Sequence, residues 1–147
     1  MNVIANESTV INQTAEVVFA YISDLEKFGE WFPGVVSIKS LNALPVTQIG
    51  KKYQEIVKLP FTGGKTVCIE VKESLLNKRL VTEGDLSPLL PRMTITLTSM
   101  QRETKINWCM ESRNNHPLFR VTLLPLARVL MSKRAKQGLC QLKSKLH

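Results

Sequence analysis

The chain has 147 residues, of which 44% are hydrophobic and 22% charged, a balance that suits one folded domain and excludes collagen-like and disordered chains. Its three cysteines, Cys68, Cys109 and Cys140, are too widely spaced for a disulfide framework or a zinc site built on paired cysteines. The start lacks a signal-peptide pattern and no apolar stretch is long enough to span a membrane, so we expect a cytoplasmic protein. We expect no metal and no cofactor.

Seven segments have the alternation or the turn boundaries of β-strands. We place them at residues 3–12, 35–43, 51–59, 65–74, 79–85, 92–100 and 104–113. Two short helices are expected after the first strand. Asn12 or Thr14 can cap the first, and Ser23 with Glu26 forms a capping box for the second. Proline and two glycines within residues 60–64 predict a hairpin, and the last six strands should form a meander.

The strands alternate most clearly at residues 65–74, 92–100 and 104–113. Apolar side chains such as Val67, Ile95 and Trp108 share one face, while Lys72 and Lys105 fall on the other. This pattern predicts a sheet with one buried face and one solvated face.

The last predicted element is a long helix from about Leu118. Pro125 should begin or kink it, and basic residues should occupy the face opposite its apolar stripe. The stripe comprises Leu123, Ala127, Leu130, Met131, Ala135, Gly138, Leu139, Leu142 and Leu146. No other element remains to cover the sheet. Because a curved sheet and a straight helix meet imperfectly, a cavity is expected between them.

Five segments in this order resemble one known superfamily. They are residues 11–19, 28–35, 49–53, 104–108 and 139–143. The segment 28–35, with its tryptophan followed by proline, is similar to the entry into the second strand of START-related and polyketide cyclase-like proteins. The resemblance implies an α+β helix-grip domain over residues 1–147, in which a seven-stranded curved antiparallel sheet surrounds the C-terminal helix. Members of that superfamily include binders, transporters and cyclases, so the fold leaves the activity open.

The cavity should be lined from the inward positions of the strands and the helix. The expected lining residues are Tyr53, Glu55, Met93, Trp108, Met110, Leu130 and Met131, with Trp31 and Phe32 at the rim. Each apolar residue among them also suits an ordinary core. Methionines adapt to varied apolar ligands, which favours a binding role for the set.

Glu55 is the best candidate for a buried carboxyl because it shares a strand face with Tyr53 and Val57. Burial would raise its pKa, and it could then act as a general acid or base. The alternative is a hydrated position at the cavity mouth. The only histidines, His116 and His147, fit neither a catalytic triad nor a metal site.

The net charge of +8 is concentrated near the end of the chain. Eight of the 20 basic residues, and none of the 12 acidic ones, lie in residues 113–147. This basic C-terminal segment can be a solvated helix face, can contact an anionic membrane, or can bind nucleic acid. We do not favour nucleic acid, because the helix lacks interleaved aromatic residues.

Three functions follow from these features. The leading one is binding or transport of a hydrophobic small molecule, such as a lipid, quinone or polyketide-like compound, without catalysis. The second is a polyketide cyclase or dehydratase. The third is an interaction protein whose basic tail binds a membrane or an acidic partner.

Overall fold

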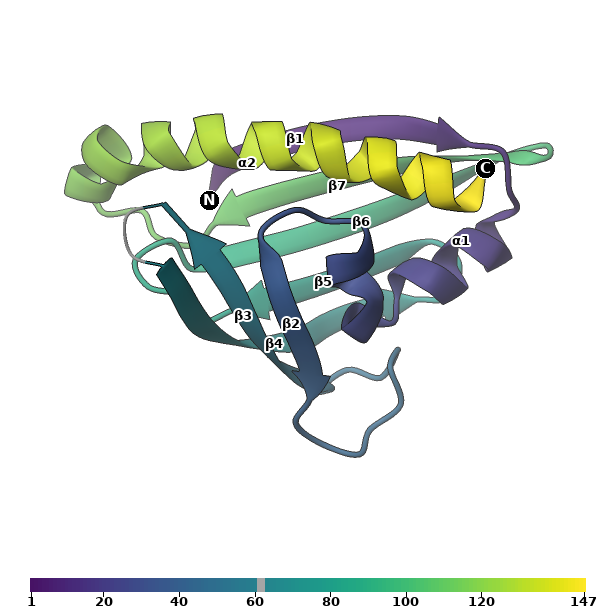
Figure 1. Ribbon diagram of the computed structural model, residues 1–147, viewed down its shortest axis with the longest axis horizontal. Helices are drawn as coiled ribbons and strands as arrows, with labels where there is room; N and C mark the ends of the chain where they lie inside the picture. Colours follow the sequence, from purple (N-terminus) through teal and green to yellow (C-terminus); the bar gives the residue numbers. More distant parts are fainter. Residues whose placement is uncertain (61–62) are drawn as a thin grey trace.

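The computed structural model describes residues 1–60 and 63–147, which form one curved antiparallel sheet with a long helix packed against it (Figure 1). The strands are β1 (Asn2–Ile11), β2 (Val35–Ser40), β3 (Lys52–Leu59), β4 (Gly63–Leu75), β5 (Arg79–Gly84), β6 (Pro91–Met100) and β7 (Glu103–Ser112). Their order in the sheet is β1-β7-β6-β5-β4-β3-β2. The predicted helix-grip fold and its six-stranded meander are therefore confirmed.

The sheet owes part of its curvature to irregular pairing. The register shifts in β1 between Val3 and Ala5, in β2 between Val35 and Ser37, and in β4 between Val71 and Glu73. Such bulges bend a strand and increase its twist. In the predicted turn at 60–64, residues 61 and 62 lie outside the described residues.

The two short helices follow β1 as predicted, with one difference at the cap of the second. Thr14 caps α1 (Ala15–Ile22), and its hydroxyl accepts a hydrogen bond from the Val17 amide at 3.4 Å. The 3₁₀ helix η1 (Leu25–Glu30) is capped by Asp24, which accepts from the Glu26 amide at 3.2 Å. The predicted capping box at Ser23 is wrong because Ser23 ends α1, where its amide donates to the Phe19 carbonyl.

The long helix α2 spans Pro117–Leu146 and runs along the sheet beside β1 (Figure 1). Its cap is His116, whose Nδ1 accepts from the Leu118 amide at 3.1 Å. Pro125 lies inside the helix and does not begin it. The described part of the chain contains no helix that is both long enough and apolar enough to cross a membrane.

The face of α2 toward the sheet agrees with the predicted stripe at Ala127, which packs against a small core, and through the second half of the helix, but not before Pro125. Ala135, Gly138, Leu139 and Leu142 are buried in the second half. In the first half the inward residues are Phe119 and Leu124, whereas Leu123 is 45% exposed. The prediction was wrong at this end because the helix starts at Pro117, and Phe119 packs with Leu124 against Ile4 of β1. The Leu123 side chain therefore points partly to solvent and not to the sheet.

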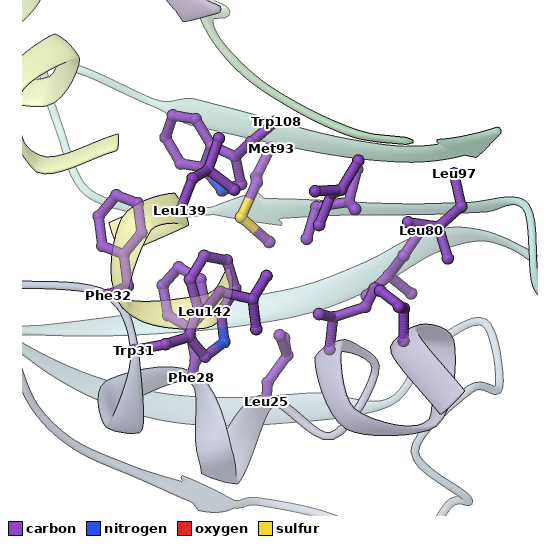
Figure 2. Packing of buried hydrophobic residues seen from close by; sticks show 14 of the residues in the cluster. Leu25, Phe28, Trp31, Phe32, Leu80, Met93, Leu97, Trp108, Leu139 and Leu142 are labelled. Carbon is purple, nitrogen blue, oxygen red and sulfur yellow. The ribbon is translucent and has the colours of Figure 1, made fainter. Parts of the chain in front are cut away.

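Most of the apolar interior forms one main core. Figure 2 shows Leu139 and Leu142 of α2 in this core together with Leu25, Phe28, Trp31, Phe32, Leu80, Met93, Leu97 and Trp108. The aromatic rings pack closely: Phe32 stacks on Phe28 at 4.8 Å and on Trp108 at 5.0 Å between ring centroids. A second, smaller core of Ile4, Phe119 and Leu124 lies under the first half of α2.

Candidate functional site

A cavity of about 90 Å³ lies between the sheet and α2, and its hollow measures about 770 Å³ when the open mouth is included. Strands β3 to β7 contribute inward side chains that include Val57, Val67, Ile69 and Met93. Phe28 and Phe32 close one side. Met131 and Arg134 of α2 and Leu89 of the loop before β6 complete the wall. The cavity is thus built mainly from apolar groups.

The cavity lies where the two cores meet. Met110 of β7 and Met131 of α2 pack against both the main core and the smaller core, and both line the cavity. Leu89, another wall residue, belongs to the surroundings of the smaller core. The hollow therefore separates two packed regions.

The structure brings five of the sequence-predicted residues together at the cavity wall. These are Glu55, Met93, Met110, Met131 and the rim residue Phe32. The other four lie elsewhere. Tyr53, Trp108 and Trp31 are almost fully buried in the main core, and Leu130 is half-buried outside the wall.

Local packing explains these placements. Phe32 covers Trp108, and the ammonium group of the buried Lys51 lies 5.5 Å from the centre of the Tyr53 ring. Neither Tyr53 nor Trp108 lines the hollow. Leu130 precedes Met131, and adjacent helical residues point about 100° apart, so only one of the two can face the cavity.

Sequence reasoning missed several wall residues, and two of them had a readable signal. Thr82 alternates with the inward Leu80 on β5, and Arg134 follows Met131 by three residues on the same helix face. Leu86 and Leu89 lie between β5 and β6, where no periodic pattern could place them.

Glu55 is the one carboxyl at the wall among the described residues, and it is only 8% exposed. Burial raises its pKa from 4.5 to about 7, because the apolar surroundings disfavour the charged form. Its strand neighbours are Val67 on β4 and Ile38 on β2. Within residues 1–60 and 63–147 the carboxyl makes no hydrogen bond or ion pair, so it remains available to a bound molecule.

Arg134 supplies the cation at the wall and is fixed by the backbone of β3. Its Nη2 donates to the Lys58 carbonyl at 2.7 Å, and its guanidinium lies directly against Gly34. Gly34 has a φ of +87°, and a Cβ there would collide with the guanidinium. Burial lowers the pKa of Arg134 from its usual value. No ion pair joins Arg134 to Glu55 in the described part of the chain.

The polar groups at the wall are few. Glu55, Thr82 and Arg134 are the side chains that could orient a ligand or take part in proton transfer. Across the residues that the structure describes, no group of three or more histidine, cysteine or acidic side chains could hold a metal ion. This arrangement can bind an apolar molecule and hydrogen-bond one or two of its polar atoms.

Comparison with known proteins agrees with the fold. Residues 3–147 match a family model described as polyketide cyclase / dehydrase and lipid transport. No curated protein sequence matches the chain.

Solved structures with 12–16% sequence identity share the fold. A protein from Thermus thermophilus is 16% identical with a TM-score of 0.75, over 97% of this chain and 95% of that one. A START superfamily protein from Mycobacterium smegmatis is 12% identical with a TM-score of 0.72, over 99% and 97%. The di-domain ARO/CYC StfQ from the steffimycin biosynthetic pathway is 13% identical with a TM-score of 0.76, and the match covers 99% of this chain and 51% of StfQ.

Proposed function

Because the chain belongs to the family described as polyketide cyclase / dehydrase and lipid transport, we propose that it binds and carries a hydrophobic small molecule in the cavity between the sheet and α2. The ligand class is a lipid, a quinone or a polyketide-like compound. The observation that carries this proposal is the apolar hollow with a single buried carboxyl at its wall.

The size of the cavity indicates how a ligand is taken up. A volume of about 90 Å³ is small beside the roughly 300–1,000 Å³ of typical ligand pockets. Uptake therefore requires the wall to yield. Met93, Met110 and Met131 are suited to this because unbranched thioether chains change shape at little cost.

Apolar burial supplies a large part of the affinity. Removing roughly 300 Å² of ligand surface from water contributes about 7 kcal/mol at about 25 cal/mol per Å², before the cost of association. Micromolar affinity corresponds to about 8 kcal/mol net of that cost, so it requires a ligand that buries more apolar surface than this.

A pair of neighbouring substitutions tests the carrier function. Met131→Trp places an indole at the cavity wall and should abolish uptake of apolar ligand, whereas Leu130→Trp adds the same group outside the wall and should preserve it. Native mass spectrometry of freshly purified protein, with extraction of the bound molecule, measures occupancy in both variants. Equal occupancy in Met131→Trp and the parent chain would rule out this cavity as the binding site.

Glu55 favours one alternative function, a cyclase or dehydratase. A carboxyl with a pKa of about 7 can both donate and accept a proton near neutral pH. If Glu55→Gln removes a measurable turnover of a polyketide-like substrate while binding persists, the enzyme replaces the carrier. If the variant binds a neutral ligand as the parent does and neither protein shows turnover, the carrier stands.

The basic C-terminal segment supports contact with an anionic membrane as part of a carrier's work. Lys133, Lys143 and Lys145 are exposed and can approach lipid phosphates. Lys136 lies 3.9 Å from Glu7, and Arg134 is bound to the Lys58 carbonyl. In the second half of α2, Lys133, Lys143 and Lys145 are therefore the basic side chains best placed for electrostatic contact.

A further inference from the structure

The first half of α2 exposes large apolar side chains on the side away from the sheet. Leu118 is 63% exposed, Val121 73%, Leu126 66% and Val129 74%. We call these four residues the outer stripe. The sequence had predicted basic residues here, so this half of the helix differs from expectation. Such a cluster of exposed leucine and valine costs solubility unless another surface covers it.

Helical geometry places the outer stripe on one side of α2. The four residues follow one another at spacings of three, five and three, which at about 100° per residue places them within an arc of about 140°. The opposite side carries the buried Leu124. Beyond Val129 the same outward side continues with Lys133, Lys136 and Cys140, all exposed. The outward side of α2 therefore changes from apolar to basic along its length.

Charge decides which partner suits the outer stripe. Arg120 and Arg128 lie exposed beside it, although Arg128 Nε donates to the Val3 carbonyl at 3.0 Å, and residues 113–147 contain no acidic side chain. A second copy of this chain would bring cations against cations. An anionic phospholipid surface supplies both complements at once, since apolar side chains enter the acyl boundary while phosphates pair with arginine and lysine.

We propose that the outer stripe inserts into the interface of an anionic phospholipid bilayer and anchors the first half of α2 there. The inference extends the proposed electrostatic contact and rests on it. It adds a hydrophobic anchor at a defined place, where electrostatic contact alone would spread along the whole helix.

The anchor lies at the cavity end of the molecule. Met131 and Arg134, which line the cavity, follow the outer stripe within two turns of the same helix. The loop before β6, which carries Leu89 of the cavity wall, is tied to the residues preceding α2: the Asn114 side chain donates to the Pro88 carbonyl at 2.8 Å. Anchoring by the outer stripe therefore holds the cavity next to the bilayer from which an apolar ligand would be drawn.

Single tryptophans on the outward side of α2 test insertion. The native Trp31 and Trp108 are 1% and 0% exposed, so they provide a constant background. Val129→Trp reports on the outer stripe. Cys140→Trp is the matched control, eleven residues or about three turns further along the same side. Vesicles of phosphatidylcholine and phosphatidylserine, with and without brominated acyl chains, are added to each variant.

With insertion, Val129→Trp emission shifts to shorter wavelength and brominated lipid quenches it, whereas Cys140→Trp changes little. If both variants bind but neither is quenched, or both are quenched equally, the proposed contact survives and the anchor is wrong. If neither variant binds vesicles, both the electrostatic contact and the hydrophobic anchor are wrong. A blue shift of Val129→Trp in buffer that grows with protein concentration would assign the stripe to self-association and also overturn the anchor.

Salt separates the electrostatic and the apolar contributions to vesicle binding by the parent chain. Raising the salt concentration should weaken the electrostatic part of vesicle binding, because salt screens interactions between charges. Residual binding should remain, because salt does not screen the burial of the apolar outer stripe. The double substitution Leu126→Ser and Val129→Ser should lower this residual partitioning at least about tenfold. Lys143→Gln with Lys145→Gln should leave it unchanged. Loss of all binding at high salt in the parent chain would contradict the anchor.

Discussion

At the scale of single residues, Glu55 shows what strand parity can predict. Its place on one face with Tyr53 and Val57 predicted a buried carboxyl, and the structure places it at the cavity wall, 8% exposed. Parity could not predict which of its neighbours reach the hollow. Tyr53 is two residues away on the same face, yet it lies in the main core. That difference depends on which side chains cover each position from across the sheet.

The raised pKa of Glu55 predicts a specific pH dependence of folding stability. Its folded value of about 7 lies above its ordinary value of 4.5, so the unfolded chain loses this proton first as pH rises. Glu55 therefore lowers the free energy of unfolding progressively between pH 4.5 and 7, by on the order of 3 kcal/mol, and the loss then levels off.

Glu55→Gln should remove that loss. The variant should match the parent chain near pH 4 and exceed it in stability at pH 8, as measured by urea unfolding at both values. Glu103→Gln, at an exposed position at the start of β7, controls for the removal of a carboxylate. Equal stability of Glu55→Gln and the parent at pH 8 would contradict the assigned burial effect.

At the scale of elements, α2 shows the limit of periodicity. The predicted stripe located the inward residues after Met131, because an uninterrupted 3.6-residue repeat fixes the helix rotation there. Before Pro125, Leu123 and Leu124 are both apolar, so the repeat leaves the rotation open. The contact of Phe119 and Leu124 with Ile4 selects the rotation, and such long-range contacts are not visible in a repeat.

Gly138 sets how closely α2 approaches the turn after η1. A Cβ at this position would lie 3.0 Å from Phe32 Cδ2 and 3.4 Å from the Trp31 carbonyl oxygen. Phe32 has little room to move because it is stacked between Phe28 and Trp108.

Gly138→Ala should therefore destabilise the protein by roughly 1–3 kcal/mol through overpacking, although alanine favours helices by about 1 kcal/mol over glycine. Thermal unfolding measures the change. Gln137→Ala, at the adjacent exposed position, should leave stability nearly unaltered. A Gly138→Ala protein that is more stable than the parent would show that Phe32 can shift.

At the scale of the whole molecule, the sequence was sufficient to predict the fold. Turn residues and alternation located the seven strands, and one long amphipathic helix was the remaining cover for their apolar face. The cavity was predicted as a general consequence of curvature, but its position was not. It depends on the boundary between two cores joined by Met110 and Met131. That boundary arises from packing between segments far apart in the chain.

The small second core makes the first half of α2 more prone to local unfolding than the second half. Its core has three buried residues, Ile4, Phe119 and Leu124, with Ala127 and Met131 partly buried against it, and Pro125 removes one helical hydrogen bond within the helix. Residues 131–146 instead dock on the main core through Ala135, Leu139 and Leu142. Native-state hydrogen exchange should show amides of residues 118–130 opening at lower free energy than those of 131–146. Uniform protection along α2 would contradict this.

Met131 lies at the junction of the two halves of α2 and lines the cavity. Local unfolding of the first half would therefore displace one wall of the cavity while the main core stays folded, and a ligand larger than the resting hollow could enter.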